Sequence, residues 1–188
     1  MNKHETLNME HETHGNVLLS PHFSLKEMTE SQTAVKHSID NTPPPEAVEN
    51  LRALCNHTLE PLRKALGLPI IITSGYRCKK LNHLLVYHSV KSQHMNGQAA
   101  DFYVSESKDL NLAPGSLNPA KPTRRKLLIK AFRQIITDDA IAFDQLIIYP
   151  SFIHVSYISR EHNRHSILKA EGNGKYCTLN RAQALSIV

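Results

Sequence analysis

Several features that define common protein classes are missing from this sequence of 188 residues. It contains no tryptophan, and no apolar run reaches the length of a secretory signal or of a membrane-spanning helix. The first 15 residues are polar and include His4, His11 and His14, which we interpret as part of a flexible tail rather than as a metal site. We therefore expect a chain that begins in the cytoplasm and has no membrane partner.

Cysteine is also scarce, because the chain has only Cys55, Cys78 and Cys177 and no C-x-x-C spacing. An odd number without paired spacing argues against a disulfide framework, so we expect free thiols in a reducing compartment. Cys55 falls on the apolar face of a predicted helix and is expected in the core. Cys78 directly follows Arg77, and we interpret it as a small buried residue, although it could also approach a site there.

The net charge is +5 with neutral histidines. This excess suits nucleic acid or any other polyanion and does not distinguish between them. The basic residues are dispersed, except for Lys121, Arg124, Arg125 and Lys126. Because aromatic side chains do not interleave with basic runs, we expect no nucleic-acid partner.

The length suits one domain with a hydrophobic core. We assign residues 1–17 to the polar tail, residues 18–170 to this domain and residues 171–188 to a C-terminal extension. Helical periodicity alternates with strand-like runs, which predicts an α+β fold with an antiparallel sheet and helices on one side. The expected helices are Phe23–Ser31, Glu46–Leu66, Arg77–Tyr87 (helix or turn) and Thr123–Thr137, and a mobile loop is expected at Ser105–Pro122. The expected strands are Ile70–Thr73, Gln98–Val104, a hairpin of Gln145–Tyr149 with Phe152–Tyr157, and an edge strand at Ser166–Lys169.

Four residues predict how two of these helices begin, bend and end. Ser24 with Glu27 three residues later has the pattern of a capping box. Pro61 lies inside the long helix and is expected to kink it, because proline has no backbone N–H. Gly67 follows the last apolar residue of that helix and is expected to end it, since glycine tolerates a left-handed backbone.

The residues that point most directly to chemistry lie in Ser92–Asp101, which reads S-x-H-x-x-G-x-A-x-D. His94 precedes a turn marked by Gly97, and a predicted strand follows. Strand alternation places Asp101 on the same face as Ala99, whose small side chain would leave room for a metal.

A second histidine, His154, lies downstream between Ile153 and Val155, whose side chains face the opposite way. A single histidine in a strand is more often a hydrogen-bonded core residue than a ligand, but the joint spacing favours a metal. His94, Asp101 and His154 supply two imidazoles and a carboxylate. This is the donor set of a zinc site with a fourth position for water, the catalytic rather than the structural form.

Further segments have the pattern of one known family. They are Ser20–Leu25, Ile39–Pro44, Thr73–Arg77 with its S-G-Y-R signature, Leu81-Asn82, Phe143–Ile147 and His154–Tyr157. With the metal motif, they make the chain resemble the zinc D-alanyl-D-alanine carboxypeptidase family. That family is related to bacteriophage cell-wall endopeptidases and to the vancomycin-resistance D,D-dipeptidases. The resemblance extends from about Leu18 to about Lys169.

This resemblance implies a zinc-dependent peptidase that cleaves peptidoglycan stem peptides, as a carboxypeptidase or as an endopeptidase. It implies one zinc per chain on His94, Asp101 and His154, with Arg77 and Ser92 binding substrate. We expect a monomer. Without an export signal, the protein would be cytoplasmic as synthesised and would reach the cell wall through lysis or a holin.

The general base is the weakest part of the resemblance. Zinc peptidases usually need a carboxylate for proton transfer, and many relatives carry it three residues before the last histidine. That position is Ser151 here. Other relatives carry an acid at the end of the preceding strand, where this chain has Tyr149. Tyr149 could donate to an oxyanion, but an ordinary tyrosine is a poor base near pH 7.

The nearest carboxylate to the last histidine is Asp144. If Pro150-Ser151 is a two-residue hairpin loop, Ile147 faces His154 and Asp144 points away from the metal. A bulge would reverse that orientation. We therefore take Asp144, acting through a bulged strand, and Tyr149 as the candidate catalytic residues.

Two other functions fit the same residues. A zinc-containing wall-binding module would keep the metal ligands but lack the base. A metal-stabilised interaction protein of phage assembly would use the metal only for its fold. Turnover of cell-wall peptides separates the enzyme from both.

Overall fold

A computed structural model describes residues 17–86, 89–106 and 122–188. Residues 1–16 of the predicted tail and residues 107–121 of the predicted loop Ser105–Pro122 lie outside these ranges. The fold is α+β, built on a six-stranded sheet in the order β3-β4-β6-β5-β7-β8. The strands of this sheet are β3 (Ile70–Ser74), β4 (Ala99–Val104), β5 (Gln145–Ile148), β6 (Ile153–Ser156), β7 (Ser166–Gly172) and β8 (Lys175–Thr178). A separate pair is formed by β1 (Leu18–Ser20) and β2 (Phe23–Ser24).

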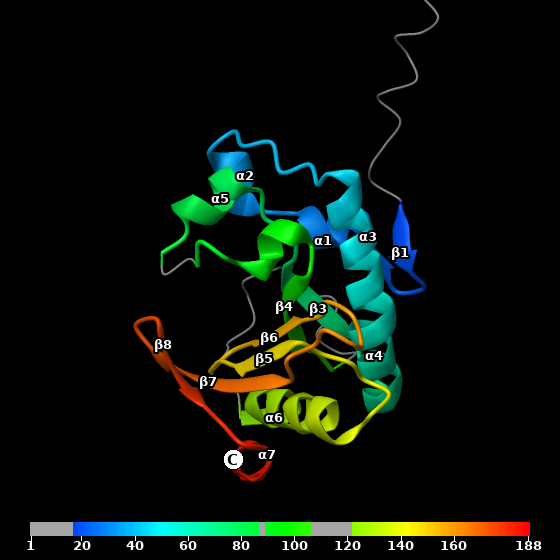
Figure 1. The fold of residues 1–188 in the computed structure, drawn as a ribbon, viewed down its shortest axis with the longest axis vertical. Helices are drawn as coiled ribbons and strands as arrows, with labels where there is room; N and C mark the ends of the chain where they lie inside the picture. Colours follow the sequence, from blue (N-terminus) through cyan, green and yellow to red (C-terminus); the bar gives the residue numbers. More distant parts are fainter. Residues whose placement is uncertain (1–16, 87–88, 107–121) are drawn as a thin grey trace, which may run out of the picture.

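The helices surround this sheet. They are α1 (Leu25–Thr29), α2 (Gln32–Lys36), α3 (Pro45–Leu54), the π-helix η2 (Cys55–Leu59), α4 (Glu60–Leu66), α5 (Lys79–Leu84), the 3-10 helix η3 (Gln93–Asn96), α6 (Pro122–Thr137) and α7 (Arg181–Leu185). Figure 1 shows α6 below the sheet, and α1, α2, α5 and η3 beyond its opposite face. The helices are therefore not confined to one side.

Strand β4 lies inside the sheet and follows the predicted alternation. Ala100, Phe102 and Val104 are buried in the main hydrophobic core, while Asp101 and Tyr103 are only partly buried. The core face is thus separated from the face that carries the predicted metal ligand.

The sheet departs from the purely antiparallel prediction at one pair of strands. β7 runs parallel to β5, with Gln145 opposite Ser166 and Leu146 opposite Ile167. Because β8 then pairs with β7, the segment predicted as an edge strand is an inner strand. The prediction was wrong because strand spacing alone does not specify which neighbour a strand will pair with.

The long predicted helix Glu46–Leu66 is interrupted at the point where Pro61 would disturb it. Pro61 cannot donate to the carbonyl of His57 four residues earlier, and the chain forms the π-helix η2 just before it. The His57 carbonyl accepts instead from the backbone N–H of Ala142 at 3.0 Å. The helix then ends at Gly67, whose φ of 63° is left-handed, as predicted.

Local signals and burial confirm several smaller predictions. The Ser24 side chain caps α1 by accepting from the N–H of Glu27 at 3.2 Å. All three cysteines are free, and Cys55 is buried in the core. Burial raises the pKa of the Cys55 thiol to about 12, so it remains protonated near neutral pH.

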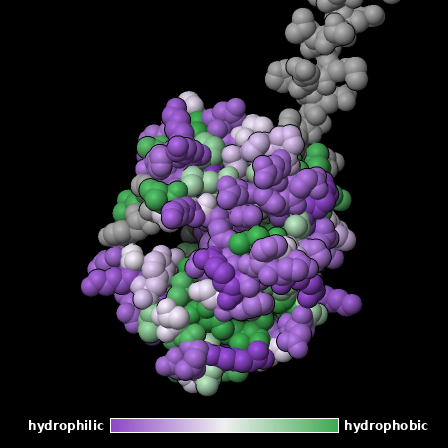
Figure 2. All heavy atoms as spheres, viewed as in Figure 1, coloured by the Kyte–Doolittle hydropathy of each residue, from purple (hydrophilic) through white to green (hydrophobic). Residues whose placement is uncertain are grey.

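The C-terminal residues also belong to the packed structure. β8 extends the sheet, and Ala184 of α7 is fully buried in the core. Figure 2 shows a mainly hydrophilic surface on the viewed side, with hydrophobic residues gathered in its lower part. Among the described residues, no helix has both the length and the apolar character needed to cross a membrane.

Candidate metal centre

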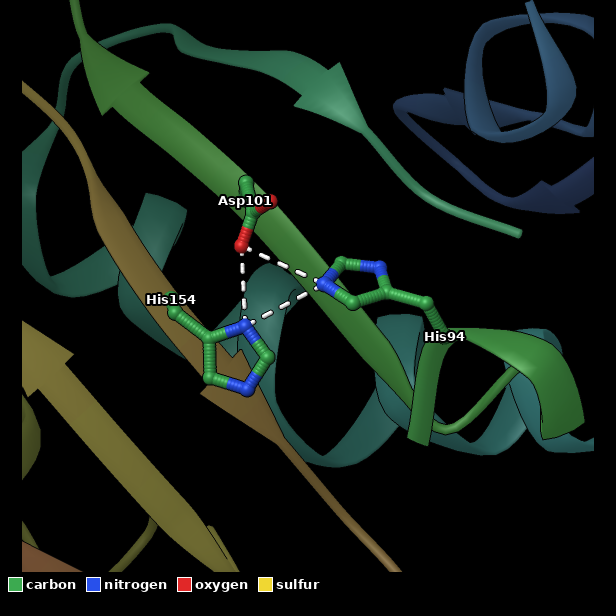
Figure 3. Close-up of side chains that lie close together, drawn as sticks. All are labelled: His94, Asp101 and His154. Atoms are coloured by element: carbon green, nitrogen blue, oxygen red, sulfur yellow. Dashed lines mark hydrogen bonds and ion pairs between the residues drawn. The ribbon is translucent and has the colours of Figure 1, made fainter. Parts of the chain in front are cut away.

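Three side chains that are distant in sequence meet at one point of the sheet (Figure 3). Antiparallel pairing places Asp101 of β4 directly opposite His154 of β6. Asp101 Oδ1 lies 2.8 Å from His154 Nδ1 and 3.3 Å from His94 Nε2, and these two nitrogens are 3.2 Å apart. His94 reaches them from η3. The group could hold a metal ion, since each residue offers one ligand atom and these atoms lie within 4.8 Å of one another.

A hydrogen bond from the ring nitrogen that does not face Asp101 and His154 fixes the orientation of the His94 ring. Its Nδ1 lies 2.7 Å from the carbonyl oxygen of Gly75, which has no proton to donate. Nδ1 must therefore carry the proton, and Nε2 faces Asp101 and His154 with a free lone pair. A backbone carbonyl that fixes the tautomer in this way is typical of metal-binding histidines.

The electrostatics of the group favour the protonation states that bind a metal. Burial lowers the pKa of His94, which favours the neutral ring. Burial alone would raise the pKa of Asp101, but the facing His94 and His154 outweigh it, so that pKa is lowered and the carboxylate is charged. One anion between two imidazoles is a suitable donor set for a divalent cation.

Gly97 of the motif has a steric reason to be glycine. Its φ is 69°, and a Cβ there would lie 2.2 Å from the carbonyl oxygen of Ala47. The neighbouring carbonyl of Asn96 accepts from the Asn50 side chain at 2.9 Å. Helix α3 therefore holds the turn that presents His94.

The S-G-Y-R segment is held to the N-terminal part of the chain in a similar way. A Cβ on Gly75 would lie 2.2 Å from the carbonyl oxygen of Met28, which accepts from the N–H of Tyr76 at 2.7 Å. The Asn41 side chain donates to the Tyr76 carbonyl at 3.1 Å and accepts from the N–H of Cys78 at 2.8 Å. These contacts fix the backbone on both sides of Arg77.

Arg77 lies between this segment and the metal group. Its N–H donates to the His94 carbonyl at 3.1 Å, and its Nη2 lies 3.5 Å from Ser92 Oγ. Burial lowers its pKa, while the charge of Asp101 opposes that shift. Its Nε is buried without a hydrogen-bond partner, and among the described residues no carboxylate lies within ion-pair distance. The guanidinium is thus a cation available to bind an anionic oxygen.

The predicted hairpin register is confirmed by the pairing of Ile147 with His154. The regular pairing of β5 with β6, however, ends before Asp144. The N–H of Asp144 donates to the Ser156 carbonyl at 2.7 Å, and the N–H of Gln145 donates to Ser156 Oγ at 3.0 Å. Two consecutive residues therefore face one residue of β6, which is a bulge.

This bulge brings the Asp144 carboxylate to the metal-bearing face of β6. Its Oδ2 accepts from Ser156 Oγ at 3.3 Å, and Ser156 shares a face with His154. Asp144 therefore does not point away as the regular hairpin would require. The carboxylate is fully buried and forms an ion pair with Arg164.

Tyr149 lies on the same face of the hairpin as His154, because it comes two residues after Ile147, which pairs with His154. Its ring stacks on Phe152 with centroids 4.1 Å apart, and its hydroxyl lies 3.0 Å from that of Tyr176. Burial, followed by the hydrogen bond with Tyr176, raises the pKa of Tyr149, so the phenol remains protonated. Neither Tyr176 nor Arg164 was singled out from the sequence, because each contacts a residue far along the chain.

The α+β fold presents two imidazoles and a carboxylate beside Arg77, which has no ion pair with any described residue, and this arrangement defines a candidate metal-dependent hydrolase. The family model described as Peptidase M15 matches residues 21–136. The chain therefore belongs to the M15 peptidase family of zinc D-alanyl-D-alanine carboxypeptidases, whose members are metallopeptidases. No match is found among the curated proteins. The matched range contains Arg77, His94 and Asp101, while His154 joins them from beyond it through the pairing of β4 with β6.

Proposed function

We propose that the protein is a zinc-dependent peptidase that cleaves peptidoglycan stem peptides, as a D-alanyl-D-alanine carboxypeptidase or as an endopeptidase. The observation that carries this proposal is the convergence of His94 Nε2, Asp101 Oδ1 and His154 Nδ1 within a family of metallopeptidases. The donor set suits zinc, because two imidazole nitrogens and one carboxylate oxygen leave a coordination position open. Bound there, zinc would supply a Lewis acid for the scissile carbonyl and lower the pKa of a water molecule.

Arg77 is the residue best placed to bind the substrate. A planar guanidinium binds a pair of oxygens with two parallel hydrogen bonds, and here it has no carboxylate partner among the described residues. Ser92 Oγ, at 3.5 Å from Nη2, holds the guanidinium loosely enough for a ligand to replace it. We assign Arg77 to the terminal carboxylate or a carbonyl of the stem peptide.

Tyr149 would act as a hydrogen-bond donor. Its raised pKa keeps the proton on the phenol, which excludes a base role near neutral pH. The charge of Asp101 raises the pKa of Tyr149 and the charge of Arg77 lowers it, so the phenol is electrostatically part of the site. A neutral donor there would stabilise the negative charge that develops on the substrate oxygen.

The predicted base, Asp144, has a carboxylate that already accepts several hydrogen bonds. Arg164, Gln93 and Ser156 all donate to it. Burial would raise its pKa, but the hydrogen bonds from Arg164 and Gln93 outweigh burial and lower it. A carboxylate with a lowered pKa accepts a proton less readily.

The same observation supports one alternative, a wall-binding module that holds zinc but has little catalysis. In that case Arg77 and the metal would bind the stem peptide without cleaving it. Asp144 would then have only a structural role, and the serine at position 151, where many relatives carry an acid, would be tolerated.

The test is mass spectrometry of purified muropeptides after incubation with zinc-loaded protein, with His94→Ala as the control. Loss of a terminal D-alanine or cleavage within the stem peptide, absent in the control, would support the enzyme. The released fragment identifies the bond. Binding to cell walls without any change in muropeptide mass would support the wall-binding module instead.

A further inference from the structure

Four side chains form a continuous hydrogen-bonded cluster next to the metal group: Gln93, Asp144, Ser156 and Arg164. Arg164 donates to Asp144 from its backbone N–H at 2.8 Å and from Nε at 2.9 Å to Oδ1, and Nη2 completes the ion pair at Oδ2. The same Nη2 donates to Gln93 Oε1 at 3.1 Å, and Gln93 Nε2 donates back to Asp144 Oδ2 at 2.9 Å. We call this cluster the Arg164 clamp.

The clamp touches both segments that supply a histidine. Gln93 directly precedes His94 in η3, and Ser156 lies two residues after His154 on the same face of β6. Asp144 joins them, because its Oδ2 accepts from Gln93 and from Ser156 Oγ. Through this one oxygen, the position of η3 is tied to the position of β6.

The burial of the clamp makes its geometry specific. The Asp144 side chain is 0% exposed, while that of Arg164 is 55% exposed and covers it. A buried carboxylate must keep its donors, because an unpaired buried charge is costly. The guanidinium of Arg164 is planar and contacts both Asp144 and Gln93. Its contact with Asp144 therefore also fixes where the Gln93 side chain lies.

We propose that Arg164 and Asp144 are positioning residues of the metal centre. Their contacts with Gln93 and Ser156 hold η3 and β6 at the spacing that lets His94 and His154 bind one ion. This inference rests on the proposed zinc site but not on catalysis. It also gives Asp144 a role other than that of general base.

A purely structural role would affect folding stability and leave zinc binding unchanged in the folded protein. Gln93→Ala separates these cases, because it removes the link to His94 and keeps the Asp144–Arg164 ion pair. Arg164→Ala removes the centre of the clamp, and Arg164→Lys keeps the charge without the planar fork. Arg160→Ala is a matched control, since Arg160 is an exposed arginine in the same segment between β6 and β7.

The measurement is the zinc dissociation constant of each full-length variant, obtained by competition with a chelator, with the melting temperature of the metal-free protein alongside. We expect Gln93→Ala and Arg164→Ala to weaken zinc binding by about 10- to 100-fold, the usual effect of residues that hold ligands. The double variant should lose little more than either single variant, since both act through one cluster. Arg164→Lys should restore only part of the affinity.

The visible absorption of the cobalt-substituted protein gives a second readout. An altered spectrum in Gln93→Ala, with an unchanged spectrum in Arg160→Ala, would show that the ligand geometry depends on the clamp. Wild-type affinity and an unchanged spectrum in folded Gln93→Ala and Arg164→Ala would overturn the proposal. If wild type bound zinc and the clamp variants weakened it, the inference would stand even if muropeptides were not cleaved.

Discussion

The imidazole of His94 and the backbone of Gly75 are joined by a hydrogen bond of 2.7 Å between Nδ1 and the carbonyl oxygen. This bond connects the S-G-Y-R segment to the metal motif. It fixes which nitrogen of His94 is free, and the same backbone continues directly to Arg77. The candidate metal site and the proposed substrate-binding residue therefore depend on one short stretch of chain, which the contacts with Met28 and Asn41 hold in place.

Removal of either histidine should abolish tight zinc binding. His94→Ala or His154→Ala leaves two protein ligands, and we expect affinity to fall by more than roughly 100-fold, beyond the effect of losing a residue that only orients a ligand. Metal analysis after reconstitution and dialysis should give one zinc per wild-type chain and almost none for the variants. Absence of stoichiometric zinc in wild type would contradict the assignment of the site.

A methyl group at Gly97 should disturb the same site through the backbone. The left-handed φ of 69° and the 2.2 Å approach to the Ala47 carbonyl both oppose a side chain. We expect Gly97→Ala to lower the free energy of unfolding by roughly 3 kcal/mol or more. Gly67→Ala is the control, since φ there is 63° but a Cβ would have no neighbour within 4 Å. It should cost only about 1 kcal/mol, and equal losses in chemical denaturation would show that the Ala47 contact is unimportant.

The residues of the candidate metal site could be predicted from their spacing and from the family resemblance, and the sheet face that carries Asp101 could be predicted from local rules. Strand alternation fixed the face of Asp101, and the two-residue loop at Pro150-Ser151 fixed the register that places Ile147 opposite His154. Both rules act over a few residues. Helix ends at Ser24 and Gly67 were predictable for the same reason.

The features that escaped prediction depend on distant partners. Arg164 lies 20 residues from Asp144, and nothing in its polar neighbourhood indicates that it covers a buried carboxylate. The parallel pairing of β7 with β5 depends on the packing of the whole sheet rather than on the strand sequence. The π-helix before Pro61 also depends on a distant contact, because the His57 carbonyl accepts a hydrogen bond from the N–H of Ala142.

Arginine and lysine should not be equivalent at position 77. Arg77→Ala should reduce kcat/KM for a stem peptide by about 10- to 100-fold, the scale of a lost hydrogen bond to a charged group. Arg77→Lys should recover only part of this, because lysine keeps the charge and loses the fork. Steady-state kinetics on folded, zinc-loaded variants would measure both. Wild-type activity in the lysine variant would exclude a bidentate contact.

Asp144→Asn distinguishes a base from a positioning residue. Loss of a general base should reduce turnover by roughly 100-fold or more while zinc affinity is unchanged. Loss of a positioning residue should weaken zinc binding as well. The amide of asparagine has only one oxygen, so it cannot accept all of the hydrogen bonds that Arg164 and Gln93 donate to the two carboxylate oxygens. Parallel measurements of kcat and of the zinc dissociation constant decide between the two roles. Unchanged values of both would exclude each of them.

The ion pair of Asp144 with Arg164 should make stability depend on pH in a defined direction. The pKa of Asp144 is lowered in the folded protein, so the stability it contributes is present above the unfolded value of about 3.9 and is lost as pH falls through the folded value. Arg164→Ala should therefore lower the free energy of unfolding by about 3 kcal/mol at pH 7. This value is at the lower end of the range for a broken buried ion pair, because Arg164 is half exposed.

Denaturant titrations of the metal-free proteins from pH 7 to pH 3 would measure this cost. The difference between wild type and Arg164→Ala should be constant down to about pH 5 and should shrink below about pH 4. Arg160→Ala should follow wild type throughout. A difference that grew toward acid pH would contradict the charge state assigned to Asp144.

The pairing of β4 with β6 has a consequence for how the chain matures. His94 and His154 are 60 residues apart, and β6 enters the sheet between β4 and β5. Any partly folded species that lacks β6 offers at most two of the three candidate ligands and would not hold a metal ion tightly. If the site binds zinc as proposed, capture of the metal therefore requires the pairing of β4 with β6, and a chain in which this pairing has not formed has no complete metal site.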